Sequence, residues 1–265
     1  MALFPVKDHQ ENRLGREGVI PADDGSSRPG AGGVLFVVAT PLGNLEDITL
    51  RALRILREVD LIAAEDTRRT RILLQAHDIQ GARLVSYHDH NERRRAPQLL
   101  DRLASGAAIA LVTDAGSALI SDPGYHLIRG AVAGGHAVRV IPGPSAPVAA
   151  LQAAGFTADS FVFHGYAPRT AGRREKLARQ MAAEPRTQLL FETPHRLGRT
   201  LDALAARMPH RPAVLCRELT KRHEEIVRGD VGDIATAARE RRMKGEMVLV
   251  VGPLPKAASR KGQTG

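Results

Sequence analysis

The sequence predicts an α/β protein of two domains. From Val34 onward, short apolar runs alternate with longer segments of helical periodicity, which is typical of βαβ units and a mainly parallel sheet. The chain has 265 residues, enough for two medium domains that each bury a core. Beyond Gly155 strands dominate, which favours antiparallel neighbours. We therefore predict an N-terminal α/β domain with a mainly parallel sheet over residues 34–155 and a C-terminal α/β domain with a mixed sheet over residues 156–252.

In the N-terminal domain, five strands alternate with five helices. The strands are short apolar runs, and the helices carry apolar residues at helical spacing. We expect strands at 34–39, 60–65, 83–87, 107–113 and 137–142. We expect helices at 47–59, 67–77, 91–106, 123–135 and 145–155, the fourth with Pro123 at its first position.

In the C-terminal domain, the same criteria predict more strands than helices. We expect strands at 160–166, 187–192, 212–219, 224–229 and 247–252. We expect helices at 172–182 and 195–208, and a short helix between the last two strands. Residues 1–33 and 253–265 are rich in charged and small residues without periodicity, so we expect a disordered extension and a disordered tail.

The charge of the chain is concentrated in its C-terminal part. The formal net charge is +9, yet residues 1–155 hold 17 Lys and Arg against 17 Asp and Glu, whereas residues 156–265 hold 21 against 12. A basic domain attached to a neutral one predicts an anionic partner such as RNA; arginines used only for solubility are the alternative. Three Tyr, six Phe and no Trp disfavour an extended base-stacking surface.

Cysteine content and hydropathy indicate the cellular setting. The single cysteine, Cys216, excludes an internal disulfide and a cysteine-rich metal site, and its apolar neighbours predict a buried thiol in a reducing compartment. No apolar stretch reaches the roughly 18 residues of a membrane span, and the N-terminus lacks a signal-peptide core. These features predict a cytoplasmic protein that does not contact membranes.

Four loops of the N-terminal domain predict a ligand site. Each follows an expected strand, and the carboxyl ends of parallel strands meet at one edge of a sheet, where small ligands bind. A tight turn that merely needs glycine is the alternative for any one of them. None carries a dinucleotide fingerprint or a Walker A sequence, and the histidines of residues 88–90 have no third ligand at useful spacing, so we expect no metal. The loops are 39–49, 65–71, the one between Thr113 and Pro123 within the stretch 111–124, and 141–147.

Three stretches of the C-terminal domain also combine acids with bases. They are FETPHR (191–196), RELTKRHEE (217–225) and KGEMVLVV (244–251). Helix capping, cross-strand ion pairs and a turn are the respective structural alternatives.

Taken together, these motifs resemble one family. VATPLGNLEDIT, AEDTRRT, LVTDAGSALISDPGYHLIRG, IPGPSA, FETPHR, RELTKRHEE and KGEMVLVV, within residues 34–252, are similar in order and spacing to the ribosomal RNA small subunit methyltransferase I family. That family belongs to the tetrapyrrole methylase-like superfamily. The resemblance implies two α/β domains with a cofactor cleft between them, and a homodimer. It also implies an enzyme that uses S-adenosylmethionine to methylate the ribose 2′-oxygen of a decoding-centre cytidine of 16S rRNA.

The resemblance also implies which residues line the cofactor cleft. Ser117 and Ala118 stand where the family usually has Thr-Pro, which keeps a hydroxyl and removes a rigid residue. Some relatives continue with a further C-terminal segment, and we expect no counterpart of it here because the sequence ends soon after its last predicted strand. The implied cofactor residues are Leu42, Asp114, Ala115, Gly116, Ser117, Ile120, Ser145 and Ala146 of the first domain, with Phe191, Glu218, Leu219 and Met247 of the second.

A ribose hydroxyl is a poor nucleophile while protonated, so we expect a general base at the cleft. We rank Asp66, Glu65 and Glu192 ahead of His195. The same acids could instead hold arginines such as Arg68, Arg196 or Arg217 in ion pairs, and the sequence leaves this alternative open.

Basic residues beside these motifs are expected to contact 16S rRNA in the small subunit. A target in structured RNA needs its nucleotide splayed out to reach a cleft. Two other functions remain open: a superfamily methylase acting on a tetrapyrrole or another small molecule, and a non-catalytic RNA-binding assembly protein. The expected RNA contacts are Arg68, Arg69, Arg71, Arg173, Arg174, Arg196, Lys221, Arg222 and Lys244.

Overall fold

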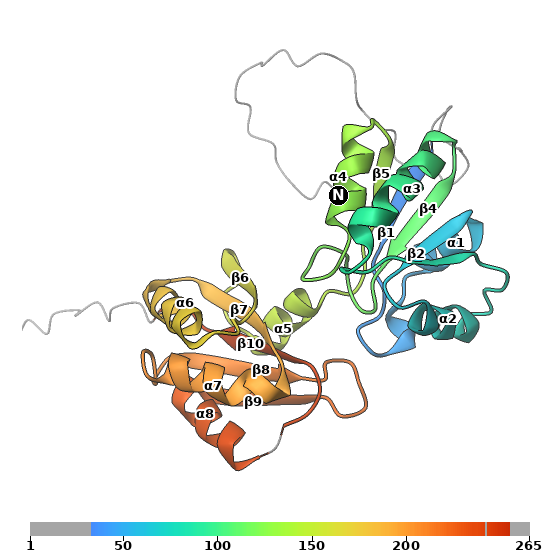
Figure 1. Cartoon of the computed structure of the whole chain (residues 1–265). Coiled ribbons are helices and arrows are strands. Elements are labelled where there is room, and N and C mark those ends of the chain that lie inside the picture. Colours follow the sequence, from blue (N-terminus) through green and yellow to red (C-terminus); the bar gives the residue numbers. More distant parts are fainter. Residues whose placement is uncertain (1–32, 242, 255–265) are drawn as a thin grey trace, which may run out of the picture. The chain divides into compact units, whose positions relative to one another are not determined.

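The structure is a computed structural model that describes residues 33–241 and 243–254. The predicted extension and tail therefore lie almost wholly outside the described residues. The predicted α/β class with one parallel and one mixed sheet is confirmed (Figure 1). No helix in the described part of the chain has both the length and the apolar character needed to span a membrane.

The first sheet contains five parallel strands in the order β3-β2-β4-β1-β5. All five strands and their helices were predicted, with ends that differ by a few residues. The strands are β1 (Val34–Val38), β2 (Leu61–Ala64), β3 (Leu84–Ser86), β4 (Ala108–Val112) and β5 (Ala137–Ile141). The helices that follow them are α1 (Leu50–Glu58), preceded by the short 3-10 helix η1 (Leu45–Asp47), then α2 (Thr67–Ala76), α3 (Glu92–Ala104), α4 (Tyr125–Ala133) and α5 (Ala146–Ala154).

Both faces of the parallel sheet are buried by helices. Because side chains of a strand alternate between faces, Phe36 and Val38 pack with α1 and α2, whereas Leu35 and Val37 pack with α3 and α4. Because helices bury both faces of the sheet, both sets of alternating side chains are apolar and the strands are continuous apolar runs. It also leaves only the two ends of the sheet, and the loops there, free to hold a ligand.

Helix α4 begins later than predicted. Pro123 is not at its first position; it lies two residues before Tyr125, the first helical residue. Gly124 between them has φ +141°, which is outside the helical region and is strained for any residue with a Cβ. The loop after β4 is therefore longer than the sequence indicated, and it carries Asp122.

The second sheet is mixed, with the order β6-β7-β10-β8-β9. Strand β6 is parallel to β7, and the remaining pairs are antiparallel, as predicted. The strands are β6 (Phe161–Tyr166), β7 (Thr187–Glu192), β8 (Pro212–Arg217), β9 (Glu225–Asp230) and β10 (Met247–Val251), and the helices are α6 (Ala171–Ala183), α7 (Pro194–Ala205) and α8 (Val231–Glu240).

Helix α5 packs on the mixed sheet, although the sequence placed it with the first domain. Its buried residues Ala150, Leu151 and Ala154 form one hydrophobic cluster with residues of β7, β8 and β10. Helices α6, α7 and α8 cover the opposite face. The sequence predicts the domain boundary at Gly155, after α5. In the structure, the chain passes from the parallel sheet to the mixed sheet before α5, in the loop that follows β5.

Candidate functional site

A cavity of about 360 Å³ lies at the carboxyl edge of the parallel sheet. The loops after β1, β2, β4 and β5 all reach it, as expected for parallel neighbours, and residues of the mixed sheet complete its wall. Its volume is in the range of small-molecule sites. The lining residues are Leu42, Glu65, Arg69, Asp114, Ala115, Gly116, Ser117, Ile120, Asp122, Ser145, Ala146, Pro147, Tyr166, Phe191, Glu192, Cys216, Leu219, Glu246, Met247 and Val248.

Eleven of the twelve residues predicted to bind the cofactor line this cavity; the exception is Glu218. Its carboxylate oxygen Oε1 instead accepts hydrogen bonds from the backbone nitrogen of Glu246 (2.8 Å) and from Nζ of Lys221 (3.1 Å). Glu218 therefore connects the loop after β8 to the residue before β10. The structure brings the other residues to one place, and their role in cofactor binding stays a prediction.

Backbone pairing joins the loops after β1 and β4 beside the cavity. Thr40 and Gly116 exchange two hydrogen bonds of 2.9 Å between their backbone groups. The hydroxyl of Thr40 donates to the carbonyl oxygen of Thr113 (3.0 Å), which buries this polar side chain without loss of a partner. Gly116 has φ +77°, so a residue with a side chain would be strained at this turn.

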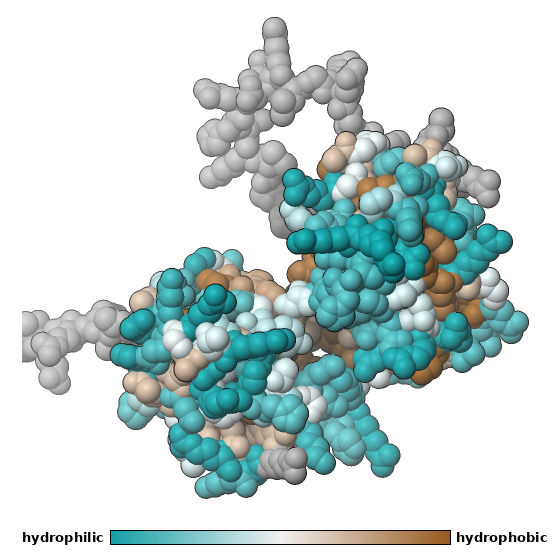
Figure 2. Space-filling model, viewed as in Figure 1, coloured by the Kyte–Doolittle hydropathy of each residue, from teal (hydrophilic) through white to brown (hydrophobic). Residues whose placement is uncertain are grey.

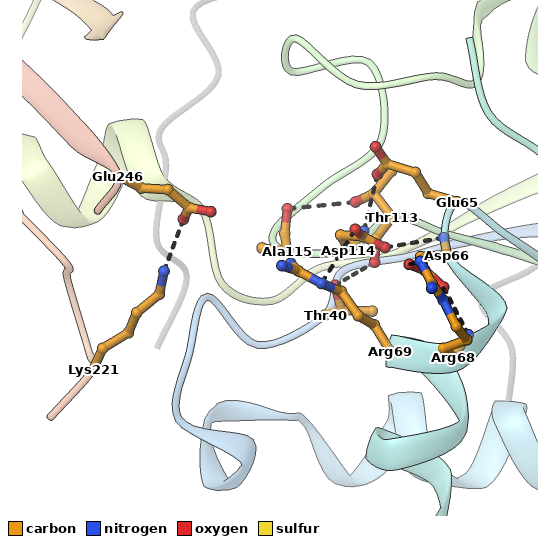
Figure 3. A network of polar contacts seen from close by, with 10 residues as sticks. All are labelled: Thr40, Glu65, Asp66, Arg68, Arg69, Thr113, Asp114, Ala115, Lys221 and Glu246. Atoms are coloured by element: carbon orange, nitrogen blue, oxygen red, sulfur yellow. Dashed lines mark hydrogen bonds and ion pairs between the residues drawn. The ribbon is translucent and has the colours of Figure 1, made fainter. Parts of the chain in front are cut away.

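Carboxylates and backbone amides join the loops after β2 and β4 (Figure 3). The backbone nitrogen of Asp114 donates to Glu65 (3.0 Å), and that of Asp66 donates to Asp114 (3.0 Å). Nε of Arg69 lies 3.6 Å from Asp114. Burial raises the pKa of both Glu65 and Asp114, because the charged form loses hydration inside the site.

Asp122 is the most perturbed carboxyl group of the cavity. Burial, followed by the charges of Glu65, Asp114, Asp89 and Glu246, raises its pKa to about 7. Among the described residues its carboxylate has no hydrogen-bond or ion-pair partner that would offset this cost. The group is therefore poised to take up or release a proton near neutral pH.

The loop that carries Asp122 has an unusual backbone. Leu119 and Ser121 have φ values of +72° and +68°, in the left-handed region that residues with a Cβ rarely adopt. Such strain persists only where the surrounding structure imposes it, and it is concentrated at functional sites.

Lys221 links the mixed sheet to the loops of the parallel sheet. Its ammonium group forms ion pairs with Glu218 (3.1 Å) and Glu246 (3.0 Å), shown in part in Figure 3. A Cβ at Gly43 would lie 2.2 Å from Cγ of Lys221, so any larger residue there would force the Lys221 side chain to shift. The neighbouring Thr220 hydroxyl accepts a hydrogen bond from the backbone nitrogen of Asn44 (3.3 Å). The loop after β8 thereby contacts the loop after β1.

Two of the three residues ranked first as a general base are held in ion pairs. Asp66 caps α2 and binds Arg68 (2.7 Å), which holds the pKa of its carboxyl below the usual range, and it does not line the cavity. The fully buried carboxylate of Glu192 accepts hydrogen bonds from Thr200 (2.5 Å) and from the backbone nitrogen of Thr193 (2.8 Å), and it pairs with Arg196 (2.9 Å). The ion-pair alternative that the sequence left open therefore describes both residues.

Glu65 and His195 complete the set of candidate bases. Glu65 lines the cavity with a raised pKa, which keeps it a candidate. His195 is exposed on α7 and does not line the cavity. His88, Asp89 and His90 lie in the loop after β3, and the described residues contain no group of His, Cys, Asp and Glu suited to a metal.

Comparison with known proteins identifies the family. The model of the tetrapyrrole (corrin/porphyrin) methylases matches residues 34–235. A "Ribosomal RNA small subunit methyltransferase I" of Halalkalibacterium halodurans is 47% identical over 219 residues, which cover 83% of this chain and 75% of that protein. The protein of the same name from Escherichia coli O157:H7 is 49% identical over 223 residues, covering 83% and 77%. The chain belongs to the ribosomal RNA small subunit methyltransferase I family.

The family assignment confirms the resemblance seen in the motifs and makes the protein a methyltransferase. Among solved structures, uroporphyrin-III C-methyl transferase from Thermus thermophilus, complexed with S-adenyl homocysteine, superposes with a TM-score of 0.59 at 17% identity. The match covers 83% of this chain and 97% of that chain. A likeness at this identity supports the tetrapyrrole methylase fold.

In this family member, the basic residues predicted to contact RNA fall into two groups. Arg196 and Lys221 are engaged in ion pairs beside the cavity, and Arg174 donates to two backbone carbonyls. The remaining six are exposed, although Arg68 and Arg69 also contact Asp66 and Asp114. Figure 2 shows that hydrophilic residues dominate the visible face of the described chain. The six exposed residues are Arg68, Arg69, Arg71, Arg173, Arg222 and Lys244.

Sequence reasoning missed three polar residues of the cavity in this family member: Asp122, Tyr166 and Glu246. Asp122 belongs to the motif after β4, and its position before Pro123 and Gly124 is the only signal in the sequence. The sequence predicts Tyr166 only as the last residue of a strand. It predicts Glu246 as part of a turn, although this residue stands directly before a buried strand.

Replacing Asp122 by Asn should make stability less sensitive to pH. The pKa of Asp122 is about 7 in the folded protein and near 4 in the unfolded chain. Between about pH 4 and about pH 7 the folded protein therefore holds a proton on Asp122 that the unfolded chain has lost. The wild-type protein loses stability as the pH rises through this range. The advantage of D122N in unfolding free energy should therefore grow by about 3 kcal/mol from about pH 4 to about pH 7. Urea unfolding at several pH values measures this. D101N, at an exposed aspartate of α3, is the control, and equal pH curves for wild type and D122N would contradict the prediction.

Replacing Glu192 by Gln should test its structural role. The change leaves the partly buried guanidinium of Arg196 without its counter-charge, so we expect a loss of about 3 kcal/mol in unfolding free energy. D66N serves as the control, because Asn caps a helix as well as Asp and the Asp66–Arg68 pair is exposed. Unfolding of both variants in denaturant provides the comparison. A stable E192Q protein would return Glu192 to the list of bases.

Proposed function

We propose that this methyltransferase uses S-adenosylmethionine to methylate the ribose 2′-oxygen of a cytidine in the decoding region of 16S rRNA. The observation that carries the proposal is the cavity in which four predicted loops and the mixed sheet meet around several carboxyl groups, one of which, Asp122, has no hydrogen-bond or ion-pair partner among the described residues. The names of the relatives support the small-subunit rRNA as substrate. The excess positive charge of the C-terminal part supports a polyanionic partner over a small molecule.

The residues of the cavity fit S-adenosylmethionine. Its sulfonium and ammonium groups are cationic, and the cavity holds the carboxyl groups of Glu65, Asp114, Asp122 and Glu246 against fewer basic groups. Apolar side chains such as Leu219 and Met247 provide walls for the uncharged parts. Backbone groups of residues 114–117, in the loop turned by Gly116, are available to the polar atoms.

When bound, S-adenosylmethionine supplies an activated methyl group, so the chain must supply position and a proton acceptor. Alignment of a 2′-oxygen at close range accounts for much of the rate of such a transfer. We propose Asp122 as the general base that accepts the proton of the ribose hydroxyl. Its pKa of about 7 makes it a stronger base than an ordinary carboxylate and still leaves it ionised in much of the protein near pH 7. Glu65, whose pKa is also raised, is the second candidate.

The RNA and a second copy of the chain are part of the same proposal. We propose that the six exposed residues named above and Arg174 contact RNA phosphates, and that Arg196 and Lys221, which are held in ion pairs, order the loops beside the cavity. The homodimer implied by the family remains a proposal as well.

Two measurements test the function directly. Purified protein with labelled S-adenosylmethionine should methylate small ribosomal subunits from cells that lack it, and mass spectrometry should find one 2′-O-methyl cytidine missing from the 16S rRNA of those cells. Transfer to a tetrapyrrole or another small acceptor, with none to RNA, would favour the small-molecule methylase. The absence of any S-adenosylmethionine binding in calorimetry would favour a non-catalytic assembly protein.

The pH dependence of the reaction should identify the base. With Asp122 as base, kcat/KM should rise with pH and level off above about 7, because kcat/KM reports the pKa of the free enzyme and only the carboxylate can accept the proton. D122N should lower kcat by about 100-fold or more and lose this rise, while its affinity for the RNA stays unchanged. E65Q is the matched comparison. Retention of the wild-type pH profile by D122N, with its loss in E65Q, would transfer the role to Glu65.

Reversing the charge at Arg173 and Arg174 should weaken RNA binding. R173E/R174E should bind the RNA at least about tenfold more weakly at moderate salt. Its affinity should also depend less on salt, because a protein that makes fewer phosphate contacts releases fewer counterions when it binds. Affinity for S-adenosylmethionine should be unchanged in calorimetry. R51E/R102E adds the same charge at exposed sites near the parallel sheet and controls for net charge. Equal RNA binding by both double variants would remove Arg173 and Arg174 from the interface.

A further inference from the structure

Tyr166 is a half-exposed aromatic residue at the cavity. It ends β6, lines the cavity and is 50% exposed, unlike Tyr87, which is fully buried. A large ring in this position is not needed to fill the hydrophobic core. Since the chain contains only nine Phe and Tyr residues, an exposed ring at the site invites a functional explanation.

An irregularity of the strand turns Tyr166 toward the cavity. The register between β6 and β7 shifts between Phe163 and Tyr166, and Gly165 within this bulge has φ +66°. Bulges of this kind redirect side chains and are common beside active sites. A Cβ at Gly165 would lie 3.5 Å from the hydroxyl of Ser121, so the bulge is next to the loop that carries Asp122.

The ring is held in place by neighbours that are themselves fixed. Phe191 meets it edge to face, with centroids 5.4 Å apart and an interplanar angle of 63°. The guanidinium carbon of Arg196 lies 5.9 Å from the ring centroid, and Arg196 is fixed by buried Glu192. An aromatic ring that is fixed before binding loses little entropy when a flat ligand stacks on it.

The neighbourhood of Asp122 indicates which flat ligand this is. Burial, followed by the charges of Glu246 and Asp122, raises the pKa of the Tyr166 hydroxyl. Tyr166 and Asp122 line the same cavity, and the bulge before Tyr166 lies against Ser121, the residue that precedes Asp122. In a nucleotide the 2′-oxygen and the base are attached to adjacent ribose carbons. A ribose that gives its proton to Asp122 therefore places its base within reach of the neighbouring ring.

We propose that Tyr166 is the stacking platform for the nucleobase of the acceptor nucleotide, an inference that rests on the proposed RNA methylation. The small number of aromatic residues excludes an extended stacking surface, but one base splayed out of the RNA needs one ring. Arg196 supports the platform from the C-terminal part and Asp122 receives the proton beside it. Phosphate contacts elsewhere then position the strand, while Tyr166 positions the reacting nucleotide.

The test compares variants that keep or remove the ring. Y166F keeps the ring, Y166L keeps apolar bulk without it, and Y125A alters an exposed tyrosine of α4 that does not line the cavity. With small subunits as acceptor, Y166L should lower kcat/KM by about 10- to 100-fold, whereas Y166F and Y125A should stay within about twofold of wild type. Affinity for S-adenosylmethionine, measured by calorimetry, should be the same in all four proteins. Thermal unfolding establishes that each variant is folded.

A fluorescent cytidine analogue at the acceptor position gives a second readout. Stacking on Tyr166 should quench it in wild type and Y166F and should not in Y166L. Equal turnover by Y166L and wild type would overturn the platform and leave the methylation intact. An equal loss of S-adenosylmethionine affinity in Y166L would assign the ring to the donor's adenine, and a loss in Y166F would assign the effect to the hydroxyl. Wild-type protein that transfers no methyl group to RNA would overturn the proposed function and the platform together.

Discussion

The hydrogen bonds between the loops after β2 and β4 are the constraint on which the site depends. Asp114 accepts a bond from the backbone of Asp66, and Glu65 accepts one from the backbone of Asp114, so each carboxylate is tied to the opposite loop. This crosswise arrangement keeps two acids together at the edge of a sheet whose faces are closed by helices. Asp122 then enters a region that is already negative and poorly hydrated, which accounts for its raised pKa.

Among the carboxyl groups of the site, Asp122 is the one whose burial opposes folding most strongly. The acids that are fully paired, Glu192 and Asp66, serve to hold α7 and α2 in place, whereas Asp122 has no hydrogen-bond or ion-pair partner within residues 33–241 and 243–254. An unpaired carboxyl that resists ionisation opposes folding at neutral pH, and natural proteins retain such groups where chemistry requires them. The strained backbone at Leu119 and Ser121 belongs to the same small region.

Much of the fold and the meeting of the loops could be predicted from the sequence. Parallel strands such as β1 and β4 must end at the same edge, so motifs more than 70 residues apart in the chain could be placed together without coordinates. Burial and orientation could not be predicted. The packing of α5 on the mixed sheet, the bulge before Tyr166 and the environment of Asp122 depend on contacts between residues distant in the chain, and no local pattern encodes them.

The position of α5 has a mechanical consequence. Within residues 33–241 and 243–254 the chain passes from the parallel sheet to the mixed sheet once, through the segment between Ile141 and Ala146. Three residues at the start of α5 and just before it, Ser145, Ala146 and Pro147, are also part of the cavity wall. The covalent connection between the two sheets is thus itself a contact surface for whatever occupies the cavity. Any change in the angle between the sheets must alter the shape presented to that occupant, and the occupant in turn must restrict that angle.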